Sequence, residues 1–413
     1  DPTTATSAAP PSLTLSECSV EATIGVCDRS TVHGLPRAPS LTLTESMILA
    51  QFTPRAGAPG ANRPLRVPLP PAGPAWFPTV MGTGILSTLI GLLWGDSRAG
   101  LAVSSVLLVA AWVLMIGLAC GFAKACARDR SVLAGAVREA SQRPAWGTVS
   151  MGVMSAGSAA STVLPLWSEA LSGVALGTDA VLWTAGTVLG LAVAADFARG
   201  TGRLGNPTPV WGLTVVAPMV SATAGCAFVP HLGSAAAKVA LLGVVAVCFA
   251  TALVLGAMVF AAAYHHHWRR ESLPLALRPS LWIPLGVVGQ STAAIQLIAS
   301  NVADLLPASA RPGVLHAAHL YGIVVLAGIG TAVSAYAAAM TISGFARRMP
   351  FGAGWWSLTF PVGTCALGAF YLGRVHGEVG WLHASGVITG VLACTWTLCA
   401  VASLTAVALE RHA

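Results

Sequence analysis

Ten long apolar segments most constrain what this chain can fold into. Each is close to the roughly 20 residues that a helix needs to cross a bilayer. The chain is 55% hydrophobic and 9% charged, whereas a soluble domain is about 25% charged. So few charges cannot cover a surface that faces water, and the sequence therefore predicts an all-α polytopic membrane protein. The segments span about 74–93, 99–123, 144–166, 176–198, 208–229, 235–263, 280–302, 313–342, 353–373 and 383–409.

The net charge of +7 does not indicate a nucleic-acid binder, because the basic residues lie in short gaps between apolar segments. Of the 22 Lys and Arg residues, sixteen fall in segments on one side of the predicted bilayer and four on the other. An excess of Lys and Arg marks the cytoplasmic side. We therefore expect a multi-pass protein of the plasma (inner) membrane, with the lipid bilayer as its partner and both termini cytoplasmic.

Residues 1–73 differ from the rest, because they are rich in Ser, Thr, Pro and Ala and contain no long apolar run. We expect this N-terminal extension to be disordered and hypothesise a physiological start at Met47. Residues 74–409 form the predicted ten-helix transporter or channel domain, and 410–413 a cytoplasmic tail. The nine cysteines form no CxxC pair or metal set with histidine, so no metal and no cofactor are predicted.

A tryptophan opens every odd-numbered segment. The spacings from Trp76 through Trp356 are 70, 65, 71 and 74 residues, so one repeat corresponds to one helical hairpin. The openings are "WFPTVMGTG" from Trp76, "WGTVSMGVMSAG" from Trp146, "WGLTVVAPMVSATAG" from Trp211, "WIPLGVVGQSTAA" from Trp282 and "WWSLTFPVGTCALGAF" from Trp355.

Proline also favours the odd-numbered segments. Pro78, Pro218, Pro284 and Pro361 lie within them, and the third segment carries Gly152 instead. A broken backbone is tolerated in lipid only where protein or water satisfies its polar groups. The pattern predicts five kinked helices around a central pore and five intact helices facing lipid. Close helix packing by small residues is the alternative interpretation.

The odd-numbered segments carry no carboxylate near their middle, although cation carriers commonly use one there. Freed backbone N–H groups, helix N-termini and hydroxyls instead suit an anion. The predicted pore-lining residues are Pro78, Thr79, Gly82, Thr83, Gly84, Ser150, Gly152, Thr214, Pro218, Pro284, Gly289, Thr359, Pro361 and Gly363.

His316 and His319 are three residues apart at the start of the eighth segment and share a helix face. Histidine titrates near neutrality, so the pair is a candidate for proton coupling; a structural hydrogen bond is the alternative. Two alternative functions remain. One is a haem-type membrane redox protein, which needs facing histidines on neighbouring helices, and the other is a sensor without transport.

The openings "WFPTVMGTGIL", "VWGLTVVAPMVSATAG" and "WWSLTFPVGTCALGAF" resemble the tellurite-resistance/dicarboxylate transporter family over about residues 74–409. That family includes tellurite-resistance permeases, malate permeases, sulfite efflux pumps and slow-type anion channels. The resemblance implies a non-enzymatic trimer in which ten helices form five hairpins with quasi-five-fold symmetry around a central pore. The implied substrates are small anions, either a C4-dicarboxylate such as malate or a sulfite- or tellurite-type oxyanion.

The resemblance also implies a gate. In the channel branch a phenylalanine before the proline of the ninth span plugs the pore, and Phe360 in "TFPVG" occupies that position. Other channels place further aromatic residues in the pore. The comparable positions here are mostly Gly, Met, Ala or Val, so a constriction of several aromatic rings is not expected.

Overall fold

A computed structural model describes residues 69–139, 141–200 and 205–411, and these residues form helices and short connections without a strand. The predicted extension lies outside the described residues up to residue 68, including the hypothesised start at Met47, as do residues 412–413. The predicted all-α class is confirmed for the described part of the chain.

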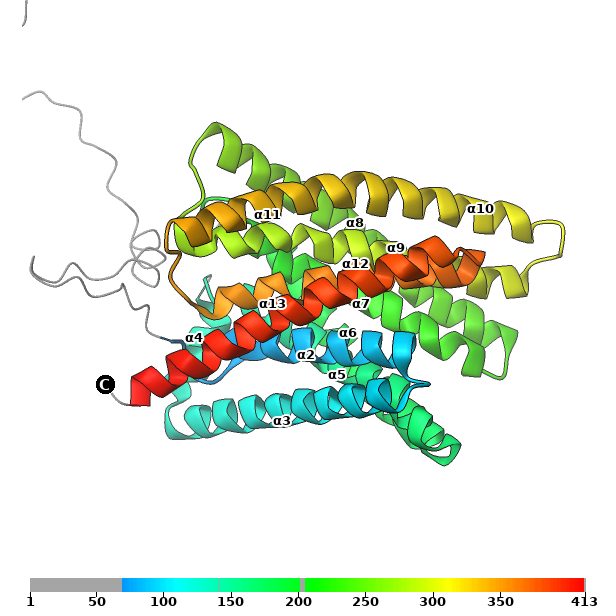
Figure 1. Ribbon diagram of the computed structural model, residues 1–413, viewed down its shortest axis with the longest axis horizontal. Helices are drawn as coiled ribbons and strands as arrows, with labels where there is room; N and C mark the ends of the chain where they lie inside the picture. The colour runs from blue at the N-terminus through cyan, green and yellow to red at the C-terminus, as the bar shows by residue number, and fades with distance from the viewer. Residues whose placement is uncertain (1–68, 140, 201–204, 412–413) are drawn as a thin grey trace, which may run out of the picture. The chain divides into compact units, whose positions relative to one another are not determined.

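The helices follow the predicted segments, with additional short elements at several helix ends (Figure 1). The odd-numbered segments contain α2 (Phe77–Trp94), α5 (Pro144–Trp167), α7 (Gly212–Gly225), α9 (Pro284–Leu305) and α12 (Phe360–His376). The even-numbered segments contain α3 (Arg98–Arg128), α6 (Ser172–Gly200), α8 (Ala235–Arg269), α10 (Arg311–Gly322) with α11 (Thr331–Ala346), and α13 (Val379–Arg411). The shorter elements are 3₁₀ turns η1 (Pro74–Trp76), η2 (Glu169–Leu171), η4 (Pro209–Trp211), η5 (Cys226–His231), η6 (Leu275–Trp282) and η8 (Ala353–Leu358), the π-helical η7 (Ile323–Gly330), and helix α4 (Arg130–Arg138).

Within the described ranges, nine helices are long and apolar enough to cross a membrane, and they coincide with nine of the ten predicted segments. The segment predicted at 353–373 differs, because it is divided into η8 and the 17-residue α12. Pro361 lies in the first turn of α12, where a missing N–H removes no helical hydrogen bond. Gly377 ends this helix in the left-handed conformation at φ 71°.

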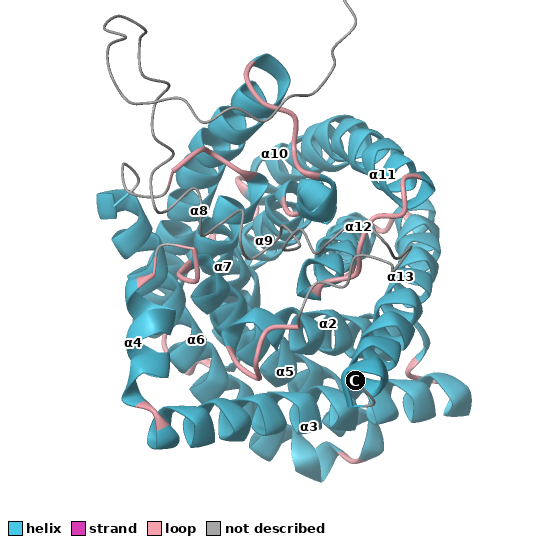
Figure 2. Ribbon diagram, turned by 90° about the vertical axis from the view of Figure 1, so that its left-hand side faces the viewer, coloured by secondary structure: helices cyan, strands magenta, loops and turns pink. Residues whose placement is uncertain are grey.

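Burial separates the odd-numbered from the even-numbered helices. In the four odd-numbered spans among the nine, 56–89% of the most apolar stretch is buried, against 17–28% in the five even-numbered spans. The odd-numbered helices also pack in a closed cycle, in which α2 contacts α5, α5 contacts α7, α7 contacts α9, α9 contacts α12 and α12 contacts α2. Figure 2, which looks along the helices, shows these five within the others.

Each even-numbered helix packs against two neighbours in that cycle. Helix α3 contacts α2 and α5, α6 contacts α5 and α7, α8 contacts α7 and α9, α10 contacts α9 and α12, and α13 contacts α12 and α2. Their outer faces are apolar: on α3, for example, Val106, Val109, Val113 and Ile116 are all more than half exposed at helical spacing. Such an exposed apolar face suits contact with lipid rather than water.

The prediction that proline kinks the odd-numbered helices is wrong for three of them. Pro78, Pro284 and Pro361 lie in the first turns of α2, α9 and α12, and each helix then runs without interruption. A first-turn N–H has no helical partner in any case, so proline starts these helices rather than breaking them. Pro218 does lie inside α7, and Pro165 lies inside α5 near its end, in the segment expected to lack an interior proline.

The two ends of the helical region meet. The backbone N–H of Leu69, just before η1, donates a hydrogen bond of 2.9 Å to the carboxylate of Glu410 near the end of α13. The two ends of the described helical region therefore lie beside each other.

Glycine allows the odd-numbered helices to approach closely. A Cβ at Gly289 of α9 would run into the backbone of Thr364 and Cys365 in α12, and a Cβ at Gly82 of α2 would run into the side chain of Thr359. Small residues bring membrane helices together in this way, because backbone contact then replaces side-chain contact.

Gly289→Ala is expected to lower the melting temperature of the detergent-purified protein by several degrees, because backbone cannot move aside as a side chain can. Gly390→Ala on α13 is the matched control, since a Cβ there meets nothing within 4 Å. The control should leave the melting temperature unchanged or raise it slightly, because alanine favours helix over glycine by about 1 kcal/mol. Equal melting temperatures for the two variants would contradict the close packing of α9 on α12.

Candidate functional site

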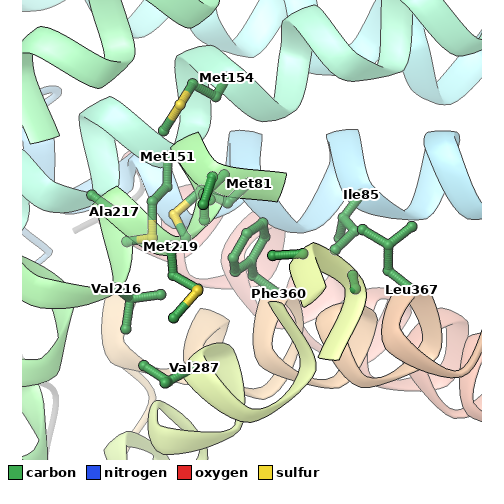
Figure 3. Close-up of a cluster of buried hydrophobic side chains, with 14 of the residues drawn as sticks. Met81, Ile85, Met151, Met154, Val216, Ala217, Met219, Val287, Phe360 and Leu367 are labelled. Carbon is green, nitrogen blue, oxygen red and sulfur yellow. The ribbon is translucent and has the colours of Figure 1, made fainter. Parts of the chain in front are cut away.

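Phe360 lies inside the cycle of odd-numbered helices. It is the first residue of α12, directly after the junction with η8 at Thr359, and its side chain is 3% exposed. It belongs to a buried apolar cluster that includes side chains from α2, α5, α7 and α9. Figure 3 shows Met81, Met151 and Met219 on one side of the Phe360 ring and Ile85 on the other.

The cluster contains an equivalent residue from every repeat. The position five residues after Trp76, Trp146, Trp211, Trp282 and Trp355 is in each case buried and belongs to this same cluster. We call this set the apolar quintet; its members are Met81, Met151, Val216, Val287 and Phe360. The fixed offset from the tryptophans is visible in the sequence, but the convergence of the five positions is visible only in three dimensions.

The quintet and its neighbours form a buried, apolar and deformable cluster. Methionine is unbranched and polarisable, so it fills irregular space and packs favourably against aromatic rings. Met81 and Met151 belong to the quintet, and Met154 and Met219 lie in the same cluster. A narrow path lined by such groups excludes water, and an anion that must lose its hydration there meets a high barrier.

The predicted hydroxyl donors already have acceptors within the protein. Thr79, Thr83, Thr214 and Thr359 each donate to a backbone carbonyl three or four residues earlier at 2.7 Å. Ser150 donates across to the carbonyl of Gly186 in α6 at 2.6 Å. A hydroxyl has one hydrogen to donate, so in this conformation these groups stabilise the helices and have no hydrogen left for an anion.

The predicted pore-lining glycines lie at contacts between helices. Beyond Gly82 and Gly289, a Cβ at Gly84 would run into Ser155 of α5, one at Gly152 would press on the ring of Phe77, and one at Gly363 would run into Ile85. These positions therefore support the packing interpretation of the glycine pattern, whereas a lining role for them stays a prediction.

Gln290 is a buried polar residue that the sequence patterns do not single out. It lies on α9, is 3% exposed, and has a side-chain oxygen without a hydrogen-bond partner among the described residues. Gln290 lies three positions after Val287 of the quintet, so the two side chains share a helix face. Burying an amide without a partner costs roughly 1–3 kcal/mol, which makes Gln290 a candidate contact for a passing ligand.

The structure separates His316 from His319. His316 is exposed, whereas His319 is half-buried and lies 2.9 Å from the carboxylate of Glu378, with its ring against that of His376. His319 thus faces groups on a different part of the chain rather than its predicted partner.

Thr214 also borders a separate cavity of about 280 Å³ among α4, α5, α6 and α7. Its lining is mostly apolar, and Arg143 and Asp196 form an ion pair of 3.2 Å beside it. Because α4 and α6 lie outside the cycle of odd-numbered helices, this cavity is distinct from the apolar quintet.

A cysteine at position 81 tests whether the quintet is dry. In a variant whose nine native cysteines are replaced by alanine, Met81→Cys should react with a water-soluble maleimide far more slowly than Ala310→Cys, which lies in an exposed turn. Adding Phe360→Ala should accelerate labelling at position 81 and leave position 310 unchanged. Equal labelling of the two positions without Phe360→Ala would show that water already reaches the quintet.

Comparison with known proteins identifies the family. The model of the voltage-dependent anion channel family, SLAC1, matches residues 72–404, which include all the membrane helices except the end of α13. No curated protein matches the chain. This family is part of the tellurite-resistance/dicarboxylate transporter group that the segment openings resemble. The chain therefore belongs to the SLAC1 family of membrane anion channels and transporters.

Proposed function

We propose that the chain conducts small anions along an axis enclosed by α2, α5, α7, α9 and α12. The observation that carries the proposal is the convergence of five repeat-equivalent residues, the apolar quintet, within a closed cycle of helices. In this proposal α12 crosses the membrane with the nine longer helices, and the ten crossings form five hairpins with quasi-five-fold symmetry. Residues 74–409 are then one transport domain.

Phe360 acts as the gate of this pathway. Its ring is the largest side chain of the quintet and is buried among methionine and aliphatic groups, so the described conformation is closed. The backbone beside Phe360 can change direction at Thr359, because η8 ends and α12 begins there. Opening then requires the ring to move away from the methionines, which are flexible enough to repack.

Membership of the family supports a small anion as the substrate. We propose a C4-dicarboxylate such as malate or an oxyanion of the sulfite or tellurite type, moved across the plasma membrane by a trimer with both termini cytoplasmic. The excess of basic residues in the segments on the N-terminal side supports that orientation. The hydrogen bond between Leu69 and Glu410 supports placing both ends on one side.

The haem-type alternative gains no support from the facing histidines. Two histidines that bind one haem iron lie on opposite faces of the porphyrin. The ring centroids of His319 and His376 are 4.4 Å apart, so the rings contact each other directly and leave no room for a porphyrin between them.

Phe360→Ala is expected to increase anion flux into proteoliposomes by at least about tenfold, the change that follows from lowering a barrier by ~1.4 kcal/mol. The flux assay uses labelled malate, succinate, sulfite, nitrate and chloride, with and without a pH gradient. Phe197→Ala is the matched control, because Phe197 is equally buried but packs against Trp211 in a separate cluster. Absence of flux for every anion, in the native protein and in Phe360→Ala, would overturn the proposed function.

Gln290 is placed to give the pathway a polar contact beside the quintet. The hydrogen bonds formed by the threonines and Ser150 leave those hydroxyls unable to donate, whereas the side-chain oxygen of Gln290 makes no hydrogen bond within the described residues. Rotation about its last bond turns either the amide oxygen or the NH₂ group toward the axis, and the NH₂ group donates to an anion.

Gln290→Leu separates this role from a structural one. Removing a buried amide without a partner should leave the melting temperature unchanged or raise it. The same variant should lower anion flux by about threefold or more, measured in the Phe360→Ala background so that the gate does not limit transport. A lower melting temperature with unchanged flux would assign Gln290 to packing instead.

A further inference from the structure

Two histidines and a carboxylate meet where α12 ends. His376 is the last residue of α12, Gly377 turns the chain in the left-handed conformation, and Glu378 follows. The N–H of Glu378 donates to the carbonyl of Gly373 at 2.9 Å, which fixes the turn. The turn directs Glu378 toward α10, where its Oε1 lies 2.9 Å from Nε2 of His319.

The hydrogen bonds of Gln296 determine which ring nitrogen of His376 donates a hydrogen bond. Gln296 is fully buried on α9, and its Nε2 donates to the carbonyl of Ala318 in α10 at 2.7 Å. A carbonyl can only accept, so the amide oxygen must face His376, and Nε2 of His376 must donate the 2.8 Å hydrogen bond between them. His376 therefore makes this hydrogen bond whether its ring is neutral or protonated, while the carboxylate of Glu378 faces His319.

The cluster accommodates one added proton more readily than two. A proton on His319 forms an ion pair with Glu378, although the direction of their contact is not that of a hydrogen bond. A second proton on His376 would place two positive rings 4.4 Å apart beside a single carboxylate, and like charges at that distance disfavour double protonation. Of the other charged or titratable groups nearby in the chain, Tyr321 on α10 and Tyr371 on α12 are half-buried, whereas the rest are exposed: Asp304 on α9, Arg311 and His316 on α10, Arg374 on α12 and His383 on α13.

These contacts join the proposed gate helices to an irregular outer helix. Gln296 is on α9 with Val287 of the quintet, and His376 is on α12 with Phe360. His319 is on α10, which continues directly into the π-helical η7, and both pack against α9 and α12. A π-helical segment inside a helix is rare and is frequently found at functional sites. The strength of the contact between His319 and Glu378 would therefore affect α9 and α12, the two helices that have to separate when the proposed pathway opens.

We propose that His319, His376 and Glu378 form a proton-binding site, and that a proton bound there holds α10 against the end of α12 and stabilises the closed pathway. This inference rests on the proposed anion transport and deepens it. The ligand is the proton itself, and His319 is the residue that carries it. Acidification then lowers anion flux, because the ion pair with Glu378 exists only while His319 is charged.

The flux test compares native protein with His319→Gln, Glu378→Gln and the matched control His316→Gln in proteoliposomes. Lowering the pH on both sides from about 7.5 to about 5.5, the range in which histidines titrate, should reduce native flux by about threefold, as expected of a partly exposed ion pair. Chloride and nitrate are the probes, because neither changes protonation over this range. The control should keep the response, whereas His319→Gln and Glu378→Gln should lose it.

A second readout does not depend on transport. In this proposal the ion pair forms only with a protonated His319, so Glu378→Gln should lower the melting temperature more at about pH 5.5 than at about pH 7.5. Native flux with a pH response that all three variants retain would overturn this inference alone. Absence of flux under every condition would overturn the proposed transport, and the melting curves would still decide whether the proton site exists.

Discussion

Contact between the backbones of the odd-numbered helices is the constraint on which the rest of this structure depends. Gly289 lies so close to Thr364 and Cys365 that no side chain fits between α9 and α12. Such proximity places the Thr364 hydroxyl 3.0 Å from the carbonyl of Leu285 and the Thr223 hydroxyl 3.1 Å from that of Gln290, so α12 and α7 contact α9. Each hydroxyl also lies within hydrogen-bond distance of a carbonyl in its own helix. Acceptors within the protein matter in a membrane, because the lipid chains provide no hydrogen-bond partners for polar groups. The helices can therefore surround a common axis without leaving their hydroxyl groups unsatisfied.

Local signals in the sequence predict the arrangement of helices well. Long apolar segments are set by bilayer thickness, and the leading tryptophans repeat with each hairpin, so the sequence alone distinguishes the buried helices from the outer ones. The same signals misplace the prolines. Pro78, Pro284 and Pro361 are expected to break helices, yet each lies in a first turn, because the apolar segment begins before the helix does. The residue at which a helix starts decides whether a proline kinks that helix or lies in its first turn.

Contacts between distant parts of the chain are beyond such reasoning. The hydroxyl of Ser150 is a donor for an anion by residue type, but it donates to the carbonyl of Gly186 on another helix, 36 residues away in the chain. Helical spacing, which is visible in the sequence, pairs His319 with His316, whereas its contacts with His376 and Glu378 arise from the turn after α12. The apolar quintet lies between these cases: its members keep a fixed offset from each tryptophan, but their convergence depends on the closure of the helix cycle.

The contact between α13 and α2 gives the cycle one further property. These helices come from opposite ends of the membrane region and pack together as neighbouring hairpins do, and Leu69 and Glu410 lie within one hydrogen bond of each other. A short linker can join Leu69 to Glu410, so a circularly permuted chain could begin at another loop and keep the same helix contacts. The order of the chain then sets which helix is synthesised first, while the closed packing sets which helices finally touch.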